Sequence, residues 1–258
     1  MQLIDSHIHL DTYSEEQRRI ILNLPEVDYY IAVSMDLASC KTNHQLALHD
    51  PRVKPAYGFH PEQELPKQEE IDALFRWMEQ HVDTMVAVGE VGLPYYKRQE
   101  NPGLEVQGYI ELLEKFILFA KKHNKPIVLH AVYEDGAIAC DLLEKHGVTK
   151  AHFHWFKGED VLIKRMIDNG YSISITPDIC YEKEIQHLAS LYPLDRIMLE
   201  TDGPWPFEGP FRNRMTNPLM IRDSMYKLAK IKGIETEKVW EKTFRHSILF
   251  YGLYNGES

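Results

Sequence analysis

The chain has little cysteine, no long apolar run and no surplus of positive charge, and each absence argues against a class of protein. Three cysteines in 258 residues, without a Cys-x-x-Cys pair, argue against a disulfide framework and against a structural zinc module. No apolar run approaches the roughly 20 residues of a membrane-spanning helix. The first residues lack the basic and apolar regions of a signal peptide. We therefore expect a cytoplasmic protein with no membrane partner.

The formal net charge is -10, which limits how the chain could bind nucleic acid. Proteins that hold long stretches of duplex usually present a basic face, because phosphate neutralisation supplies most of their affinity. A short single strand or a chain end held at a metal site needs only a few positive groups. Arg212 and Arg214, on one loop, could supply them.

Strand patterns and helical patterns alternate along the whole chain. Short runs rich in β-branched and aromatic residues predict eight strands. These are Leu3–Leu10, Tyr29–Met35, Val53–Phe59, Met85–Val91, Ile127–Val132, Ala151–Phe156, Tyr171–Thr176 and Ile197–Thr201. Between them lie amphipathic helical patterns, such as the one formed by Ile71, Leu74, Phe75 and Met78. Mostly apolar strands separated by helices favour a parallel sheet buried on both faces. We predict an α/β protein, a single (β/α)8 TIM barrel over residues 1–258.

Residues that commonly bind metal ions recur at the ends of the predicted strands. His7 and His9 lie two residues apart on the first strand, so both imidazoles point to the same side. In (β/α)8 enzymes the active site lies at the carboxyl ends of the strands, where residues far apart in sequence meet. One buried histidine alone is commonly satisfied by a backbone carbonyl, but six such residues on five strands predict a metal centre. The predicted ligands are His7, His9, Glu90, His130, His154 and Asp202.

Short motifs, most of which contain a predicted ligand, follow one another in a fixed order over nearly the whole chain. They are Asp5-Ser6-His7-Ile8-His9-Leu10-Asp11, Gly58-Phe59-His60-Pro61, Gly89-Glu90-Val91-Gly92-Leu93, Leu129-His130, His154-Trp155-Phe156-Lys157-Gly158 and Glu200-Thr201-Asp202-Gly203-Pro204. This series resembles the TatD family of metal-dependent deoxyribonucleases, within the amidohydrolase-like barrels, and so implies a TIM barrel of the metallo-dependent hydrolase type. The resemblance implies two divalent metal ions, one held by His7, His9 and Asp202, the other by His130 and His154, with Glu90 bridging. It also implies that His60 faces the substrate, against a phosphate.

The chemistry of these residue types favours hydrolysis. Four histidines favour zinc as the bound ion, while the carboxylates leave manganese or magnesium open. A divalent ion lowers the pKa of bound water from near 16 to about 7, and a second ion some 3.5 to 4 Å away stabilises the leaving oxygen. We predict cleavage of DNA phosphodiester bonds by a metal-activated water, with single strands, chain ends or a small phosphoester as substrate and no obligate protein partner. Asp202 is the predicted proton acceptor, and Glu90 and His60 are the other predicted catalytic residues.

Asp5 and Glu200 neighbour the predicted ligands, and two interpretations of them remain open. They either orient the ligands through hydrogen bonds or cap the ends of their strands.

Two positions depart from the family pattern and bear on the substrate. Pro94 follows Leu93 where the family usually has an aspartate, and Val132 stands where an arginine typically follows His130 by two residues. Valine cannot replace the bidentate hydrogen bonds that arginine makes to phosphate. The first alternative is therefore a hydrolase of the same scaffold that acts on a small ester, lactone or amide. The second is a catalytically idle metal-binding scaffold protein.

The loop of residues 203–214, directly after Asp202, is rich in proline and aromatic residues and predicts a wall of the site. Trp205 could stack on a base, whereas a packed loop is the favoured interpretation of Phe207 and Phe211. For Arg212 and Arg214, contact with the substrate and exposure as solvated loop charges remain two open interpretations.

Overall fold

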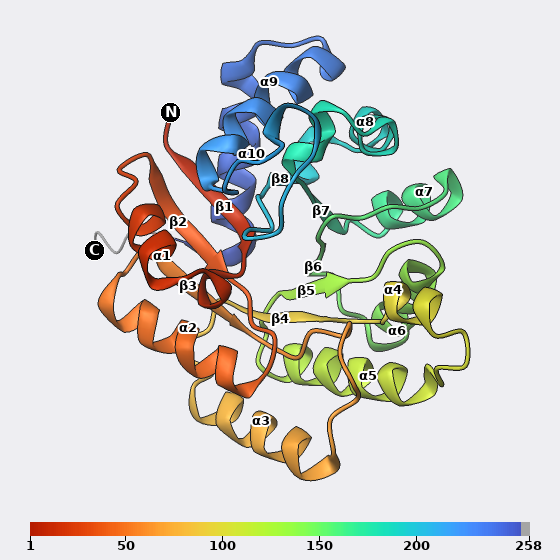
Figure 1. The fold of residues 1–258 in the computed structure, drawn as a ribbon. Coiled ribbons are helices and arrows are strands. Elements are labelled where there is room, and N and C mark those ends of the chain that lie inside the picture. The colour runs from red at the N-terminus through yellow and green to blue at the C-terminus, as the bar shows by residue number, and fades with distance from the viewer. Residues whose placement is uncertain (254–258) are drawn as a thin grey trace.

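The computed structural model describes residues 1–253 and shows parallel strands surrounded by helices (Figure 1). The strands are β1 (Leu3–Ile8), β2 (Val27–Ala32), β3 (Val53–Tyr57), β4 (Ala87–Gly92), β5 (Ile127–His130), β6 (Ala151–Phe153), β7 (Ser172–Ile175) and β8 (Ile197–Leu199). They form one eight-stranded sheet in which neighbours in sequence are neighbours in space, from β1 to β8. The predicted (β/α)8 barrel and all eight strands are confirmed. Most strands end before the predicted apolar run ends, because its last residues turn into the loops that carry the site.

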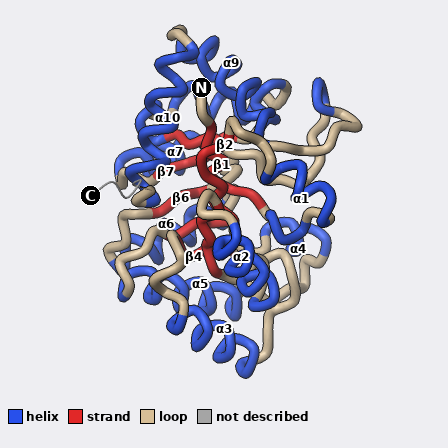
Figure 2. The backbone as a smooth tube through the Cα atoms, turned by 90° about the vertical axis from the view of Figure 1, so that its left-hand side faces the viewer, coloured by secondary structure: helices blue, strands red, loops and turns tan. Residues whose placement is uncertain are grey.

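Helices follow the strands and cover the outside of the sheet (Figures 1 and 2). They are α1 (Glu15–Leu22), α2 (Leu37–His49), α3 (Gln68–Gln80), α4 (Tyr95–Glu100), α5 (Gln107–Lys122), α6 (Glu134–His146), α7 (Asp160–Asp168), α8 (Lys183–Leu191), α9 (Ile221–Lys232) and α10 (Thr236–Tyr251). Local signals set several of their ends. Ser14 and Gln17 form a capping box that begins α1, and Gly147, in the left-handed conformation, ends α6.

The core lies between the barrel and the helices. The apolar face predicted for α3 packs inward, with Ile71, Leu74 and Met78 buried. Phe75 stacks on Phe116 of α5 at 4.7 Å between ring centroids, which joins the two helices over the same side of the sheet. Burying a side chain of this size contributes about 1.5–3 kcal/mol to stability. The apolar residues predicted to share one face of α3 are therefore the ones that pack against the core.

Backbone hydrogen bonds join the first strand to the segment that follows the last one. The amide of His9 donates to the carbonyl of Gly203 at 2.8 Å, and the amide of Asp202 donates to the carbonyl of His7 at 2.9 Å. This closure places Asp202 beside the histidine pair although nearly 200 residues separate them.

Within residues 1–253, no helix has the length and apolar character needed to cross a membrane. The cytoplasmic location stays a prediction. The extent of the domain also stays a prediction, and residues 254–258 of the predicted range lie outside the described residues.

Candidate metal centre

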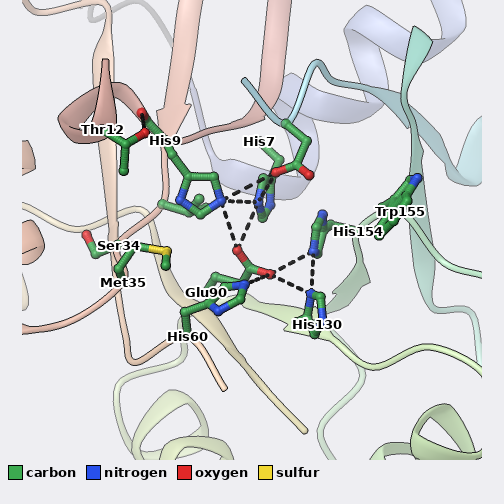
Figure 3. A network of polar contacts seen from close by, with 12 residues as sticks. His7, His9, Thr12, Ser34, Met35, His60, Glu90, His130, His154 and Trp155 are labelled. Carbon is green, nitrogen blue, oxygen red and sulfur yellow. Dashed lines mark hydrogen bonds and ion pairs between the residues drawn. The ribbon is translucent and has the colours of Figure 1, made fainter. Parts of the chain in front are cut away.

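The six predicted ligands converge at the carboxyl ends of the strands, as Figure 3 shows for the five that it labels. They come from β1 and its end (His7, His9), β4 (Glu90), β5 (His130), the residue after β6 (His154) and the loop after β8 (Asp202). All six are buried. Residues from five strands thus share one small volume at the mouth of the barrel.

Glu90 lies at the centre of this group, and its two carboxylate oxygens face different histidines. Oε2 lies 3.1 Å from Nε2 of His7 and 3.2 Å from Nε2 of His9. Oε1 lies 3.1 Å from Nδ1 of His130 and 2.7 Å from Nε2 of His154. The carboxylate therefore has the arrangement of a bridge between two sets of ring nitrogens (Figure 3).

Asp202 completes the first set. Its Oδ1 lies 3.4 Å from Nε2 of His7 and 3.4 Å from Nε2 of His9, and these two nitrogens are themselves 3.4 Å apart. Two ligand atoms that are each about 2.1 Å from one ion lie about 3.4 Å apart at a tetrahedral angle. The spacing of His7, His9 and Asp202 is thus the spacing of ligands around a single ion.

The second set is less complete. His130 Nδ1 and His154 Nε2 are 3.1 Å apart, which also fits two ligands of one ion. His60 follows β3 and places its Nε2 3.5 Å from Oε1 of Glu90. Glu62, which no sequence pattern indicates, places its Oε1 3.2 Å from Nε2 of His130 and so holds this ring from the side away from Glu90. Glu62 also accepts the backbone N–H group of Tyr96 at 2.9 Å, an interaction that periodicity gives no reason to expect.

Several polar atoms of the site have no hydrogen-bond partner among the described residues. They are Nδ1 of His7 and His9, both carboxylate oxygens of Glu90, and Oδ1 of Asp202. A buried carboxylate without partners is costly unless a cation neutralises it. Four imidazoles and two carboxylates are ligands suited to zinc and to neighbouring divalent ions. The residues present therefore fit a metal centre.

The charges of these groups depend strongly on one another. Burial alone would raise the pKa of Glu90, but the surrounding histidines, His154 above all, hold that pKa well below its usual range. Burial lowers the pKa of His9, but the nearby carboxylates of Asp202 and Glu90 outweigh it and raise the pKa to about 10. Burial lowers the pKa of His60 to about 3, so its ring is neutral at pH 7. Protons on ligand histidines must leave when a metal binds.

The two acidic residues with open roles behave differently. Asp5 accepts the backbone N–H group of Thr201 at 3.0 Å and its hydroxyl at 2.5 Å, so it ties β1 to the end of β8. Burial raises the pKa of Asp5 to about 7. Glu200 instead places Oε1 3.6 Å from Nδ1 of His154, the ring nitrogen that points away from Glu90. The orienting interpretation fits Glu200, and the strand-end interpretation fits Asp5.

Glu200 is also the end of a buried chain of hydrogen bonds. The Ser174 hydroxyl donates to Oε2 of Glu200 at 2.5 Å. Because that hydroxyl has a single hydrogen, it accepts from Nε2 of His152, 2.6 Å away. Nδ1 of His152 lies 2.6 Å from the hydroxyl of Tyr251, which also donates to the carbonyl of Ser6 at 3.3 Å. We call Tyr251, His152, Ser174 and Glu200 the relay; it ends at the carboxylate that faces His154.

A cavity of about 330 Å³ opens beside the ligands. It is lined by His60, Tyr96, His130, His154, Trp155, Lys157, Asp178, Tyr181, Glu182, Asp202, Trp205, Pro206 and Phe207. The structure places Trp205 and His60 at this cavity, as the sequence predicts. No role is predicted from the sequence for Trp155 and Lys157. Both belong to the motif that begins with the predicted ligand His154, and that position could have indicated that they lie at the site.

The structure favours one of the two interpretations of Arg212 and Arg214, that of solvated loop charges. Neither residue lines the cavity. Arg212 is 72% exposed and pairs with Glu208 at 2.8 Å, and Arg214 lies over the ring of Phe211 at 5.6 Å. Phe211 is buried beside Phe207 and Met220, so the loop packs through these apolar side chains while the Arg212 charge faces solvent.

Comparison with known proteins agrees with this geometry. Residues 4–252 match the family model described as "TatD related DNase". An uncharacterized metal-dependent hydrolase of Haemophilus influenzae is 41% identical over 252 residues, which cover 97% of this chain and 100% of the relative. The human deoxyribonuclease TATDN3 is 31% identical over 206 residues, which cover 77% of this chain and 74% of the relative.

A solved structure supports the fold in the same way. The TatD homologue YjjV of Escherichia coli superposes with a TM-score of 0.82 at 21% identity, covering 97% of this chain and 98% of that one. At this identity the likeness concerns the barrel alone. The family match over nearly the whole chain, together with the relative from Haemophilus influenzae, shows that this chain belongs to the TatD family of metal-dependent hydrolases.

Proposed function

We propose that the protein hydrolyses phosphodiester bonds of DNA, at single-stranded ends or in a small phosphoester, with two divalent ions. The observation that carries this proposal is the position of Glu90, which turns one oxygen toward His7 and His9 and the other toward His130 and His154. A centre with two separate sets of ligands and one bridging carboxylate is typical of enzymes that hydrolyse phosphoesters.

Each set of residues would hold one ion. His7, His9 and Asp202 would hold the first, His130 and His154 the second, and Glu90 would contact both. Bound divalent ions supply an acidified water molecule and neutralise the charge that develops on the phosphate oxygens. Zinc fits the four imidazoles best, and manganese or magnesium would suit the carboxylates.

Two residues of the chain have further tasks in this proposal. Asp202 lies at the wall of the cavity with a side chain that is 13% exposed, and its Oδ1 faces His7 and His9. While Oδ1 would hold the ion, its other carboxylate oxygen would accept a proton from water and return it to the leaving oxygen. His60 is neutral at pH 7 because burial lowers its pKa to about 3, so it would donate a hydrogen bond to a phosphate oxygen without adding charge.

The deoxyribonuclease name of the human relative supports DNA as the substrate. One observation favours the alternative, a hydrolase of small esters, lactones or amides. Val132 is fully buried, so the position where the family has an arginine offers no phosphate contact. The cavity of about 330 Å³ is near the lower end of the roughly 300–1,000 Å³ found for small-molecule sites, which suits a chain end or a small ester better than a duplex.

The test is hydrolysis of a labelled single-stranded oligonucleotide and of bis(p-nitrophenyl) phosphate after chelation and re-addition of zinc, manganese or magnesium. We expect an added ion to restore cleavage in the wild type but not in the double variant His7→Ala/His9→Ala. The double variant His49→Ala/His187→Ala is the matched control, because both rings lie outside the ligand group and pair with surface atoms. Metal-loaded protein that cleaves neither phosphodiester but hydrolyses a neutral ester would overturn the proposal in favour of the alternative.

A further inference from the structure

Lys157 is the one lysine or arginine of the described residues that lines the cavity beside the ligands. It follows β6 by four residues, three positions after the predicted ligand His154. Its Nζ atom lies 4.0 Å from the centroid of the Trp155 ring. A positive charge therefore stands at the wall of a cavity whose other ionisable lining groups are histidines, tyrosines and carboxylates.

The ammonium group of Lys157 has no partner that would occupy its donors. Within residues 1–253, no carboxylate lies in ion-pair range of its Nζ, and no acceptor makes a hydrogen bond to it. Other lysines behave differently: Lys97 pairs with Glu64 at 2.6 Å, and Lys145 pairs with Glu114 at 2.7 Å. Three N–H donors of Lys157 are therefore available to a ligand in the cavity.

Trp155 fixes the place of this ammonium group. Its indole Nε1 donates to Oδ2 of Asp178 at 2.7 Å, and its backbone N–H group donates to Oε1 of Glu200 at 3.1 Å. Asp178 is itself buried and also accepts the hydroxyl of Thr176. These two hydrogen bonds fix the indole ring and the backbone of Trp155, and a cation over the face of the ring gains electrostatic attraction. The backbone carbonyl of Lys157 is held as well, by the backbone N–H group of Tyr133 at 2.6 Å.

We propose that Lys157 binds a phosphate oxygen of the substrate and so makes the site selective for anionic phosphoesters of nucleotide size. It would supply, from the loop after β6, the positive group that Val132 cannot supply after β5. The rings of Tyr96 and Trp205 at the same cavity offer apolar faces to the rest of such a substrate. This inference rests on the proposed function, because it names the substrate group that the metal centre would act on.

A purely structural role for Lys157 makes a different prediction. The lysine could serve only to offset the charge of Asp178, whose pKa burial raises and to which Lys157 is electrostatically coupled. Replacing the lysine would then lower thermal stability and leave substrate affinity unchanged. Binding a substrate phosphate predicts the opposite pattern.

The first experiment compares Lys157→Gln and Lys157→Arg with wild type on an anionic diester, the p-nitrophenyl ester of thymidine 5′-monophosphate. We expect KM to rise about tenfold or more in Lys157→Gln with kcat within about twofold, and the arginine variant to recover most of the loss. Lys164→Gln, on the exposed face of α7, is the matched control and should behave as wild type. An unchanged KM in Lys157→Gln, while wild type cleaves the diester, overturns the inference and leaves the proposed function standing.

The second experiment needs no turnover. Binding of thymidine 5′-monophosphate to metal-loaded protein is measured by calorimetry for wild type and Lys157→Gln. We expect the dissociation constant to rise about tenfold in the variant. If the wild type cleaves no phosphodiester but the two dissociation constants differ in this way, the inference about Lys157 is supported and the proposed function is refuted. Equal dissociation constants, or no binding to wild type, overturn the inference.

Discussion

Ser174 connects His152 to Glu200, so the variant Ser174→Ala tests whether the relay supports metal binding. The substitution removes the 2.5 Å hydrogen bond to Glu200 and leaves the Nε2–H group of His152 without an acceptor. A hydrogen bond to a charged group contributes about 1.5–3 kcal/mol. Suppose that about half of this hydrogen-bond free energy serves to keep His154 oriented through Glu200. The affinity for one ion then falls roughly tenfold when the bond is lost, since 1.4 kcal/mol corresponds to a factor of ten. Loss of comparable outer contacts in other metal sites costs about 10- to 100-fold.

The assay is competition with a chromogenic chelator, fitted for two ions per chain. We expect the ion that His154 would hold to bind about tenfold more weakly and the other to keep its affinity within about twofold. Ser190→Ala is the matched control, because the Ser190 hydroxyl bonds only the carbonyl of His187 on an exposed helix end. Unchanged affinity at both sites, together with a lower melting temperature of the metal-free variant, would refute the reasoning and assign the relay to packing.

Three further predictions concern the rest of the barrel. A Cβ at Gly92 would lie 1.8 Å from the carbonyl oxygen of His130, so Gly92→Ala should lower the free energy of unfolding in urea by at least about 3 kcal/mol. A variant that unfolds at the same urea concentration as the wild type would contradict this. Burial lowers the pKa of His246 to about 4, so the free energy of unfolding should fall by about 3 kcal/mol as the pH drops from about 6.5 to 4. The variant His246→Asn should not show that loss, and an equal loss in the variant would exclude His246 as its source. Burial raises the pKa of Cys40 and of Cys140 to about 12, so a disulfide reagent at pH 8 should modify these two thiols only after unfolding. Half-buried Cys180 should react earlier, which mass spectrometry can follow. Equal modification rates at all three cysteines would contradict the packing.

The sequence predicts the barrel and the convergence of the ligands because both follow from periodicity. Each predicted ligand lies at or just after an apolar strand, and parallel strands carry their carboxyl ends to one face. His7 and His9 share a side because side chains alternate along a strand, and Asp202 joins them because the barrel closes between β1 and β8.

The surroundings of the ligands could not be predicted in the same way. Glu62 and Lys157 lie on loops, where no repeat fixes the direction of a side chain. The relay joins Tyr251 at the end of α10 to residues of β6 and β7, a contact set by tertiary packing alone. The sequence leaves the role of Arg212 open because its loop follows Asp202, whereas the structure shows its side chain exposed and paired with Glu208.

The most direct test of the two-ion centre is the metal content of the protein after equilibrium dialysis against zinc or manganese. We expect two ions per chain for the wild type and fewer than two for Glu90→Gln, since both carboxylate oxygens of Glu90 face ligand nitrogens. Glu208→Gln changes an exposed carboxylate that pairs with Arg212 and with none of the ligand nitrogens; it serves as the control and should retain two ions. A single ion in the wild type, or two ions retained by Glu90→Gln, would contradict the account.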